Sequence, residues 1–208
     1  MIPSSTGHAR TRMIDTNDIT AIILAGGRGS RMGGRDKGLV TLSDRPMITH
    51  VLDALKPQVG KIIISANRNL SRYASFGFPV ISDELEGYQG PLAGILAGMK
   101  HVDTPWVLCA PCDAPALPRD LARRLAQALD RQPAELAVVH DGANLQPAFL
   151  LASLALKEDL ADYLRRGKRK LGQWCNKHNP ALADYSNAPE HFINVNHTGD
   201  LETLPASG

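Results

Sequence analysis

The sequence lacks the features of a secreted, membrane-spanning or disulfide-stabilised protein. Its 208 residues include three cysteines, Cys109, Cys112 and Cys175, too few for a disulfide framework in a chain of this length. No stretch approaches the roughly 18 consecutive apolar residues of a membrane span, and the first residues lack the apolar core of a signal peptide. We therefore expect a cytoplasmic protein that does not contact a membrane.

The sequence also has little net charge and no internal repeat. A formal net charge of +2 gives no reason to expect a nucleic-acid partner. Residues 1–18 show no helical or strand periodicity, so we assign them to a disordered N-terminal tail. Residues 19–208 suffice for one sizeable core, and we expect a single domain and a monomer.

Short runs rich in Ile, Val and Leu predict strands buried on both faces. Helical patterns lie between them, beginning after Pro46, Pro91 and Pro118. This alternation predicts an α/β fold: a three-layer α/β/α, Rossmann-like arrangement with a mostly parallel sheet. The pattern changes after His140, which predicts an antiparallel part in the C-terminal half. The predicted strands span 19–24, 61–65, 106–110, 135–140, 147–151 and 192–195, and a further helix spans 153–165.

A glycine-rich, basic segment, AIILAGGRGSRMGGRDKG (residues 21–38), includes the end of the first predicted strand and the loop after it. Glycines let backbone N–H groups approach a ligand closely, and such donors suit phosphate oxygens. Arginines and a lysine, among them Arg31 and Lys37, add positive charge. Open α/β sheets bind ligands where loops leave their strands, so the segment predicts a phosphate site. The alternative is a surface loop whose charge serves no ligand.

Two other phosphate-binding motifs fit this segment poorly. Gly27, Gly29 and Gly33 have the spacing GxGxxxG, and the next strand is followed by Asn67 rather than by the acidic residue that a dinucleotide site uses for ribose. No Gly-Lys-Ser/Thr sequence closes the segment, as a P-loop requires.

The sequence LAGGRGSRMGGRDKG resembles the signature loop of nucleotidyltransferases, and its GGRDK ending resembles the molybdenum cofactor guanylyltransferases, the MobA family. Cytidylyl and sugar relatives usually begin this loop Ala-Ala-Gly. The resemblance covers residues 19–201. It implies a nucleotidyltransferase fold with GTP and molybdopterin as substrates, residues 19–115 forming the GTP and magnesium half and residues 116–208 the molybdopterin half.

A carboxylate, Asp113, follows the strand predicted at 106–110 in the sequence VLCAPCDAP. If the strand order is 3-2-1-4, Asp113 faces the glycine-rich loop across the switch point of the sheet. A carboxylate opposite a triphosphate suggests Mg²⁺, whereas a turn cap is the alternative role. The family resemblance implies that Asp113 holds Mg²⁺ on the α-phosphate of the nucleotide.

Cys109 and Cys112 form a CxxC, which invites a zinc or redox interpretation. No second CxxC or histidine pair completes a tetrahedral zinc site. A redox pair normally opens a helix, whereas this one ends a predicted strand. We expect neither chemistry.

Asn67 and Asp83 follow the second and third strands and should lie at the same sheet edge as the loop. Guanine presents N1–H and N2–H₂ donors, so a guanine pocket needs acceptors such as the Asp83 carboxylate. Ordinary turn chemistry at strand ends is the alternative. By resemblance, Lys37, Arg31 and Asp113 are catalytic, and the GTP-binding residues are Leu24, Ala25, Gly26, Gly27, Lys37, Asn67, Asp83 and Asp113.

A basic segment with no acidic residue, LRRGKRKLGQWCNKH, spans residues 164–178. The anionic pterin phosphate of the family needs such cations; a solvated helical face, or an RNA site with Trp174 as a stacking surface, are alternatives. In INVNHTGDL two asparagines stand two apart on the last predicted strand, hence on one face, where amides suit a pterin edge. The predicted molybdopterin contacts are Gln146, Arg169, Asn194 and Asn196.

The resulting hypothesis is nucleotidyl transfer, in which the terminal phosphate of molybdopterin attacks the α-phosphorus of GTP and pyrophosphate leaves. A phosphate nucleophile is ionised at pH 7, so no general base is needed; Lys37 and Arg31 oppose the β and γ oxygens. The competing hypotheses are a cytidylyl or sugar-phosphate transferase of the same fold and a non-catalytic nucleotide- or RNA-binding module. Proteins that supply molybdopterin or accept the cofactor are further candidate partners, in transient contact.

Overall fold

The computed structural model describes residues 14–27, 36–83 and 90–195. In these residues seven strands form one sheet in the order β5-β4-β1-β6-β8-β7-β9. The first four in chain order, β1, β4, β5 and β6, therefore stand in the order 3-2-1-4 across the sheet, which is the condition set above for Asp113 to face the glycine-rich loop. The strands are β1 (Ile19–Leu24), β4 (Lys61–Ser65), β5 (Val80–Ile81), β6 (Trp106–Pro111), β7 (Leu136–His140), β8 (Leu145–Ser153) and β9 (Ala181–Asp184).

The sheet is mostly parallel. β5, β4, β1 and β6 all pair in parallel, and β9 pairs in parallel with β7. β8 runs antiparallel to both of its neighbours, β6 and β7. The predicted antiparallel part of the C-terminal half is thus confirmed. A short antiparallel ribbon, β2 (Thr41–Leu42) with β3 (Arg45–Pro46), lies outside this sheet.

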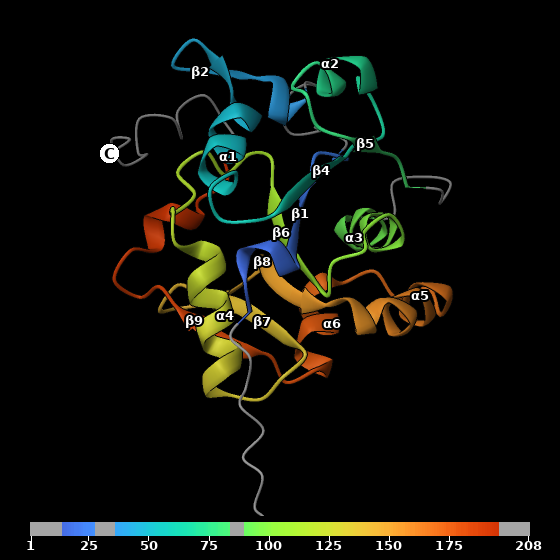
Figure 1. Ribbon diagram of the computed structural model, residues 1–208, viewed down its shortest axis with the longest axis vertical. Helices are drawn as coiled ribbons and strands as arrows, with labels where there is room; N and C mark the ends of the chain where they lie inside the picture. The colour runs from blue at the N-terminus through green and yellow to red at the C-terminus, as the bar shows by residue number, and fades with distance from the viewer. Residues whose placement is uncertain (1–13, 28–35, 84–89, 196–208) are drawn as a thin grey trace, which may run out of the picture.

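Helices cover both faces of the sheet (Figure 1). One face carries α1 (Met47–Leu55) and α4 (Leu121–Arg131), and the other carries α3 (Pro91–Lys100), α5 (Lys157–Arg165) and α6 (Leu171–Lys177). This is the expected three-layer α/β/α arrangement. None of the described helices is both long and apolar enough to cross a bilayer.

Strand β1 shows why the central strands are apolar along their whole length. Ala21 and Ile23 pack into the core beneath α1 and α4, whereas Ile22 packs into the core beneath α3 and α5. Successive side chains of a strand point to opposite faces, and both faces are covered here. An unbroken apolar run therefore replaces the alternation of a half-exposed strand.

Several predicted boundaries are wrong. Residues 192–195 form no strand: Phe192 ends the 3-10 helix η5 (Pro189–Phe192), residues 193–195 are irregular, and the Val195 N–H donates to the carbonyl of Asp113 at 2.9 Å. Strand β9 was not predicted. The helix expected over 153–165 begins with a 3-10 turn, η4 (Leu154–Leu156), and becomes α-helical only at Lys157.

The ordered chain also begins before residue 19. Asp15 caps the 3-10 helix η1 (Thr16–Asp18), and the Gly60 N–H donates to the carbonyl of Thr16 at 2.7 Å. The assignment of residues 14–18 to a disordered tail is therefore wrong. Residues 1–13 lie outside the described chain.

A buried glutamine, Gln58, ties α1 to the start of α4. Its Nε2 donates to the carbonyls of Ala54, at 2.8 Å, and Pro118, at 2.9 Å. Its Oε1 accepts from the N–H of Ala122 in the first turn of α4, at 2.9 Å. Gln58 thereby satisfies three backbone groups and fastens the chain that leads from Asp113 into α4.

We expect Gln58→Met to lower the free energy of unfolding by about 2–4 kcal/mol, because buried backbone groups lose their partner. The matched control is Gln132→Met, since the exposed Gln132 amide lies 3.5 Å from its acceptor, the Asn179 carbonyl; its cost should stay below about 0.5 kcal/mol. Denaturant unfolding of both variants measures the difference. Equal losses would show that Gln58 does not fasten the two helices.

Candidate functional site

The carboxyl ends of four parallel strands meet at one edge of the sheet. Leu24 at the end of β1 pairs with Ser65 of β4 and with Pro111 of β6, and Ser65 pairs with Ile81 of β5. The ladder continues one step further, because the Ala25 N–H donates to the carbonyl of Ser65 at 2.7 Å. The residues that follow these strands are therefore brought together, and open α/β sheets bind ligands at this edge.

An ion pair lies at this edge, with 2.9 Å between Lys37 Nζ and Asp113 Oδ2. The side chains are 23% and 10% exposed, respectively, so water screens the pair less than at an open surface. Lys37 begins the 3-10 helix η3 (Lys37–Leu39), and Asp113 follows β6. The structure thus brings two of the predicted catalytic residues into direct contact.

The residues predicted to read the base also contact each other. Asn67 Nδ2 donates to Asp83 Oδ2 at 2.6 Å, and the Asp83 N–H donates to Asn67 Oδ1 at 3.1 Å. This reciprocal pairing fixes the orientation of the Asn67 amide. It joins the segment after β4 to the segment after β5.

The start of the glycine-rich segment runs along the same edge. A Cβ on Gly26 would lie 3.4 Å from Asn67 Nδ2, which places this backbone against the predicted base-reading pair. A Cβ on Gly27 would meet no described atom within 4 Å. Leu24 and Ala25 are held by sheet pairing, and the Ala25 side chain is buried. Arg31 lies outside the described residues.

Gln146 approaches the same edge from the C-terminal half. β8 is antiparallel to β6, with Cys109 opposite Leu150, so the start of β8 lies toward the end of β6 that leads to Asp113. Gln146 Nε2 donates to Asp141 Oδ2 at 2.6 Å. The hydrogen bond from the Asn144 N–H, together with those from the Gln146 amide and the Ala143 N–H, holds the pKa of Asp141 below its usual range, so Asp141 remains an ionised acceptor for the glutamine amide.

Arg169 closes the C-terminal end of α5. Its Nη1 donates to the carbonyls of Leu164, at 2.7 Å, and Lys168, at 2.8 Å. A Cβ on Gly90 would lie 3.9 Å from the Arg169 carbonyl, which places this segment beside the start of α3. Gly90 has φ +80°, a conformation that L side chains rarely adopt. The predicted molybdopterin residue therefore has a local structural role as well.

The last two predicted residues follow η5. Asn194 precedes Val195, whose N–H bonds to the Asp113 carbonyl, so Asn194 lies next to the segment of the predicted metal ligand. Asn196 lies outside the described residues. The reasoning that put both asparagines on one face of a strand is wrong, because residues 193–195 form no strand.

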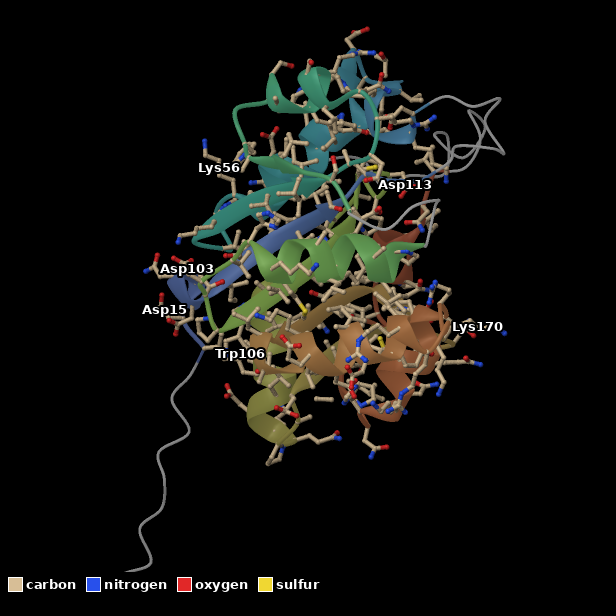
Figure 2. The ribbon with its side chains drawn as sticks, turned by 90° about the vertical axis from the view of Figure 1, so that its right-hand side faces the viewer. Asp15, Lys56, Asp103, Trp106, Asp113 and Lys170 are labelled. Atoms are coloured by element: carbon tan, nitrogen blue, oxygen red, sulfur yellow. The ribbon has the colours of Figure 1, made fainter. Side chains whose placement is uncertain are left out.

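Lys170 of the basic segment lies at the end of the molecule that carries Asp113. Figure 2 shows Lys170 and Asp113 on the same side, opposite Asp103 and Trp106. Trp174 is fully buried and its Nε1 donates to Asp159 Oδ1 at 3.1 Å, so it offers no stacking surface for RNA. Lys177 also pairs with Asp159, which removes part of the charge available to a ligand.

The three cysteines are free and buried. Burial raises the pKa of Cys175 to about 12 and those of Cys109 and Cys112 well above their ordinary value, so all three are protonated thiols at neutral pH. Among the described residues no group of three or more His, Cys, Asp and Glu side chains is arranged to hold a metal ion. Both observations argue against the zinc and redox interpretations of the CxxC.

Sequence reasoning missed one cluster at the site. The Asp36 carboxylate accepts hydrogen bonds from Tyr73 Oη, at 2.5 Å, and Asn69 Nδ2, at 2.9 Å, and lies 3.4 Å from Arg68 Nε. The only sequence signal was the position of Asp36 directly before Lys37 in GGRDK. Its partners lie more than 30 residues away, at α2 (Leu70–Ala74), and no local pattern indicates them.

The seven-stranded sheet with its helices is the nucleotidyltransferase fold. The structure of molybdopterin-guanine dinucleotide biosynthesis protein A from Archaeoglobus fulgidus superposes with a TM-score of 0.72 at 20% identity, covering 89% of this chain and 95% of that one. The 4-diphosphocytidyl-2C-methyl-D-erythritol synthase of Anaerococcus prevotii gives 0.70 at 15% identity, covering 92% and 96%. At these identities the likeness establishes the shared fold.

Sequence comparison narrows the class to one family. The MobA-like NTP transferase domain matches residues 21–181. The molybdenum cofactor guanylyltransferase of Shewanella sediminis is 50% identical over 178 residues, or 86% of this chain and 91% of that protein. The protein of the same name from Shewanella loihica is 49% identical over 178 residues, with the same coverage. The chain belongs to the MobA-like NTP transferase family.

We expect the native protein to expose less than one thiol to Ellman's reagent at pH 8 over the first minutes, because raised pKa values and burial both suppress the reactive thiolate. All three cysteines should react once guanidinium unfolds the chain. Absorbance at 412 nm with and without denaturant provides the count. Rapid reaction of two thiols in the native protein would revive a redox role for the CxxC.

Proposed function

We propose that this chain is a molybdenum cofactor guanylyltransferase, which transfers GMP from GTP to the terminal phosphate of molybdopterin and releases pyrophosphate. The observation that carries the proposal is the identity of 49–50% over 86% of the chain to proteins of that name. The contact between Lys37 and Asp113 at the carboxyl edge of the sheet supports it, because it places a cation and a carboxylate where the fold binds nucleotides.

Guanylyl transfer needs the two substrates to be aligned and their negative charge to be neutralised. An oxygen of the molybdopterin phosphate forms a bond to the α-phosphorus of GTP, and the bond from that phosphorus to the oxygen bridging the β-phosphate breaks. The attacking phosphate is already ionised, so no side chain has to remove a proton. Lys37 and Arg31 neutralise the charge that grows on the leaving pyrophosphate.

The donor set fits Mg²⁺ shared with the substrate. Mg²⁺ takes one or two protein carboxylates and fills its remaining positions with phosphate oxygens and water. Asp113 is the carboxylate that contacts Lys37, is 10% exposed in its side chain, and would hold the ion. When bound, the metal supplies charge neutralisation at the α-phosphate. Lys37 is bonded to the same carboxylate, so it would exchange Asp113 for phosphate oxygens when the metal and the nucleotide are bound.

Asn67 and Asp83 are the proposed readers of guanine. A carboxylate that accepts the bond from Asn67 retains acceptor capacity for N1–H and N2–H₂ of the base. The hydrogen bonds between Asn67 and Asp83 fix the carboxylate before the base binds, which lowers the entropic cost of ordering the Asp83 side chain on binding. Gly26 lies beside this pair, and the backbone of Leu24, Ala25, Gly26 and Gly27 is the proposed contact surface for the nucleoside.

The molybdopterin side is assigned to the C-terminal half, 116–208. Gln146, Arg169, Asn194 and Asn196 are its proposed contacts, with residues 164–178 supplying positive charge for the pterin phosphate. The position of Lys170 on the Asp113 side of the molecule supports this division (Figure 2). The cytoplasmic location, the monomeric state and transient contact with proteins that supply molybdopterin or receive the product stay predictions.

The proposal is tested by nucleotide binding followed by transfer. Mg·GTP should bind at least about tenfold more tightly than Mg·CTP or Mg·ATP, since a site built on hydrogen bonds rejects a base that leaves them unmade. With α-³²P-labelled GTP and molybdopterin, label should appear in the dinucleotide, and Asp113→Asn should remove the Mg²⁺ dependence. Preference for CTP would indicate cytidylyl transfer, and the absence of any Mg²⁺-dependent preference would indicate a non-catalytic module.

Lys37→Met should lower kcat by about 10²-fold, because its contact strengthens as charge develops on the leaving pyrophosphate. KM for GTP should change less than about threefold. The control is Lys56→Met, which removes an exposed cation at the end of α1. Steady-state kinetics of both variants separate the two constants, and a raised KM with unchanged kcat would assign Lys37 to ground-state binding.

A further inference from the structure

Asp36 directs its carboxylate away from the helix that it precedes. It is the N-cap residue of η3, yet its side chain makes no capping hydrogen bond there. The carboxylate instead accepts from Tyr73 Oη and Asn69 Nδ2 and faces Arg68 Nε, and it is 6% exposed. We call these four residues, Asp36, Arg68, Asn69 and Tyr73, the Asp36 clasp.

The far side of the clasp is fixed by packing. Tyr73 is fully buried in the core beneath α1 and α4, and its N–H donates to the carbonyl of Asn69. Burial raises the pKa of Tyr73 far above its ordinary value, and the hydrogen bond to Asp36 adds to that effect, so the hydroxyl remains a donor. Asn69 has φ +52°, in the left-handed region that asparagine tolerates, just before α2.

Gly38, the residue after Lys37, is also held in place by close packing. A Cβ on Gly38 would lie 2.8 Å from Tyr73 Oη and 2.9 Å from Cys112 Sγ. The bare glycine therefore lets η3 sit directly against Tyr73 and against the residue that precedes Asp113. The backbone of Lys37 is fixed between the clasp and this close approach.

We infer that Asp36 is a positioning residue for Lys37. The hydrogen bonds from Tyr73 and Asn69 hold Asp36 in place, and Asp36 thereby fixes the backbone from which the lysine side chain reaches the phosphates. The inference rests on the proposed role of Lys37 in guanylyl transfer. A lysine side chain is long and flexible, so the protein controls its reach through the position of its Cα. A misplacement of about 1 Å is enough to cost up to about 10²-fold in rate.

The clasp also starts beside the proposed base-reading pair. Arg68 directly follows Asn67, whose amide is bonded to Asp83. One short segment, residues 67–73, therefore contacts the base-reading carboxylate at its start and the neighbour of Lys37 at its end. Asp36 links the two ends of the nucleotide site through this segment.

The test compares two tyrosines in matched settings. Tyr73→Phe removes the hydroxyl that holds Asp36, and Tyr185→Phe removes the hydroxyl of an equally buried tyrosine, which donates at 2.9 Å to Asp120, the residue before α4. Tyr73→Phe should lower kcat about tenfold while the Kd for Mg·GTP stays within about twofold. Tyr185→Phe should leave kcat within about twofold. Thermal unfolding checks that both variants are folded.

A second measurement needs no turnover. Lys37 is acylated with an amine-reactive ester under limiting conditions and quantified by mass spectrometry. Its reactivity should rise at least about threefold in Tyr73→Phe, as the loosened backbone exposes the amine, and stay unchanged in Tyr185→Phe. If the wild type transfers no GMP, the proposed function fails while this contrast still tests the clasp. Equal labelling, or equal kcat, in both variants would overturn the positioning role.

Restoring the donor and acceptor provides the rescue. In Asp36→Asn an amide donor faces the amide donor of Asn69, so the hydrogen bond between the two residues is lost. Adding Asn69→Asp restores an acceptor opposite the new donor, and aspartate tolerates the left-handed backbone at this position. The single variant should lose about tenfold in kcat, and the double variant should recover at least part of that loss. No recovery in a folded double variant would count against the clasp.

Discussion

The parallel pairing of β1 with both β4 and β6 is the constraint on which the site depends. It sets Leu24, Ser65 and Pro111 at one level, so the chain leaves three neighbouring strands at the same edge. Lys37 reaches Asp113 there although 76 residues separate them. A slip of β1 by one residue would turn its side chains to the opposite faces and break the layered core. The strand register that packs the core is therefore the same register that brings the site residues together.

The sequence predicts the central strands well because their residues are buried on both faces. β1 and β4 have the predicted bounds, and the order 3-2-1-4, which the sequence left as a condition, is the order observed. β9 was missed because it has four residues that alternate between buried and exposed, with Leu182 49% exposed. The strand expected near Phe192 is wrong because Phe192 and Val195 serve the core without a partner strand.

The candidate site was predictable where a residue directly follows a strand. Asn67, Asp83 and Asp113 each stand two residues after a strand and could be placed at one edge by topology, whereas Lys37 was placed there by the glycine-rich loop. The structure pairs Lys37 with Asp113 and Asn67 with Asp83. Their transfer roles rest on family resemblance. Asp36 could not be predicted, because its burial depends on α2, and neither spacing nor composition indicates that contact. The two asparagines after η5 show the reverse error, an inference from strand periodicity where no strand exists.

The central place of β1 has a consequence for how the protein is made. β1 is the first strand to leave the ribosome, yet its two neighbours end 41 and 87 residues after Leu24, at Ser65 and Pro111. The middle of the sheet therefore stays incomplete until β6 has been synthesised, with an apolar strand lacking one partner. Contacts of such long range slow folding and leave the growing chain prone to aggregation. The sheet edge that carries the proposed nucleotide site is therefore assembled late in synthesis, after β6 has been made.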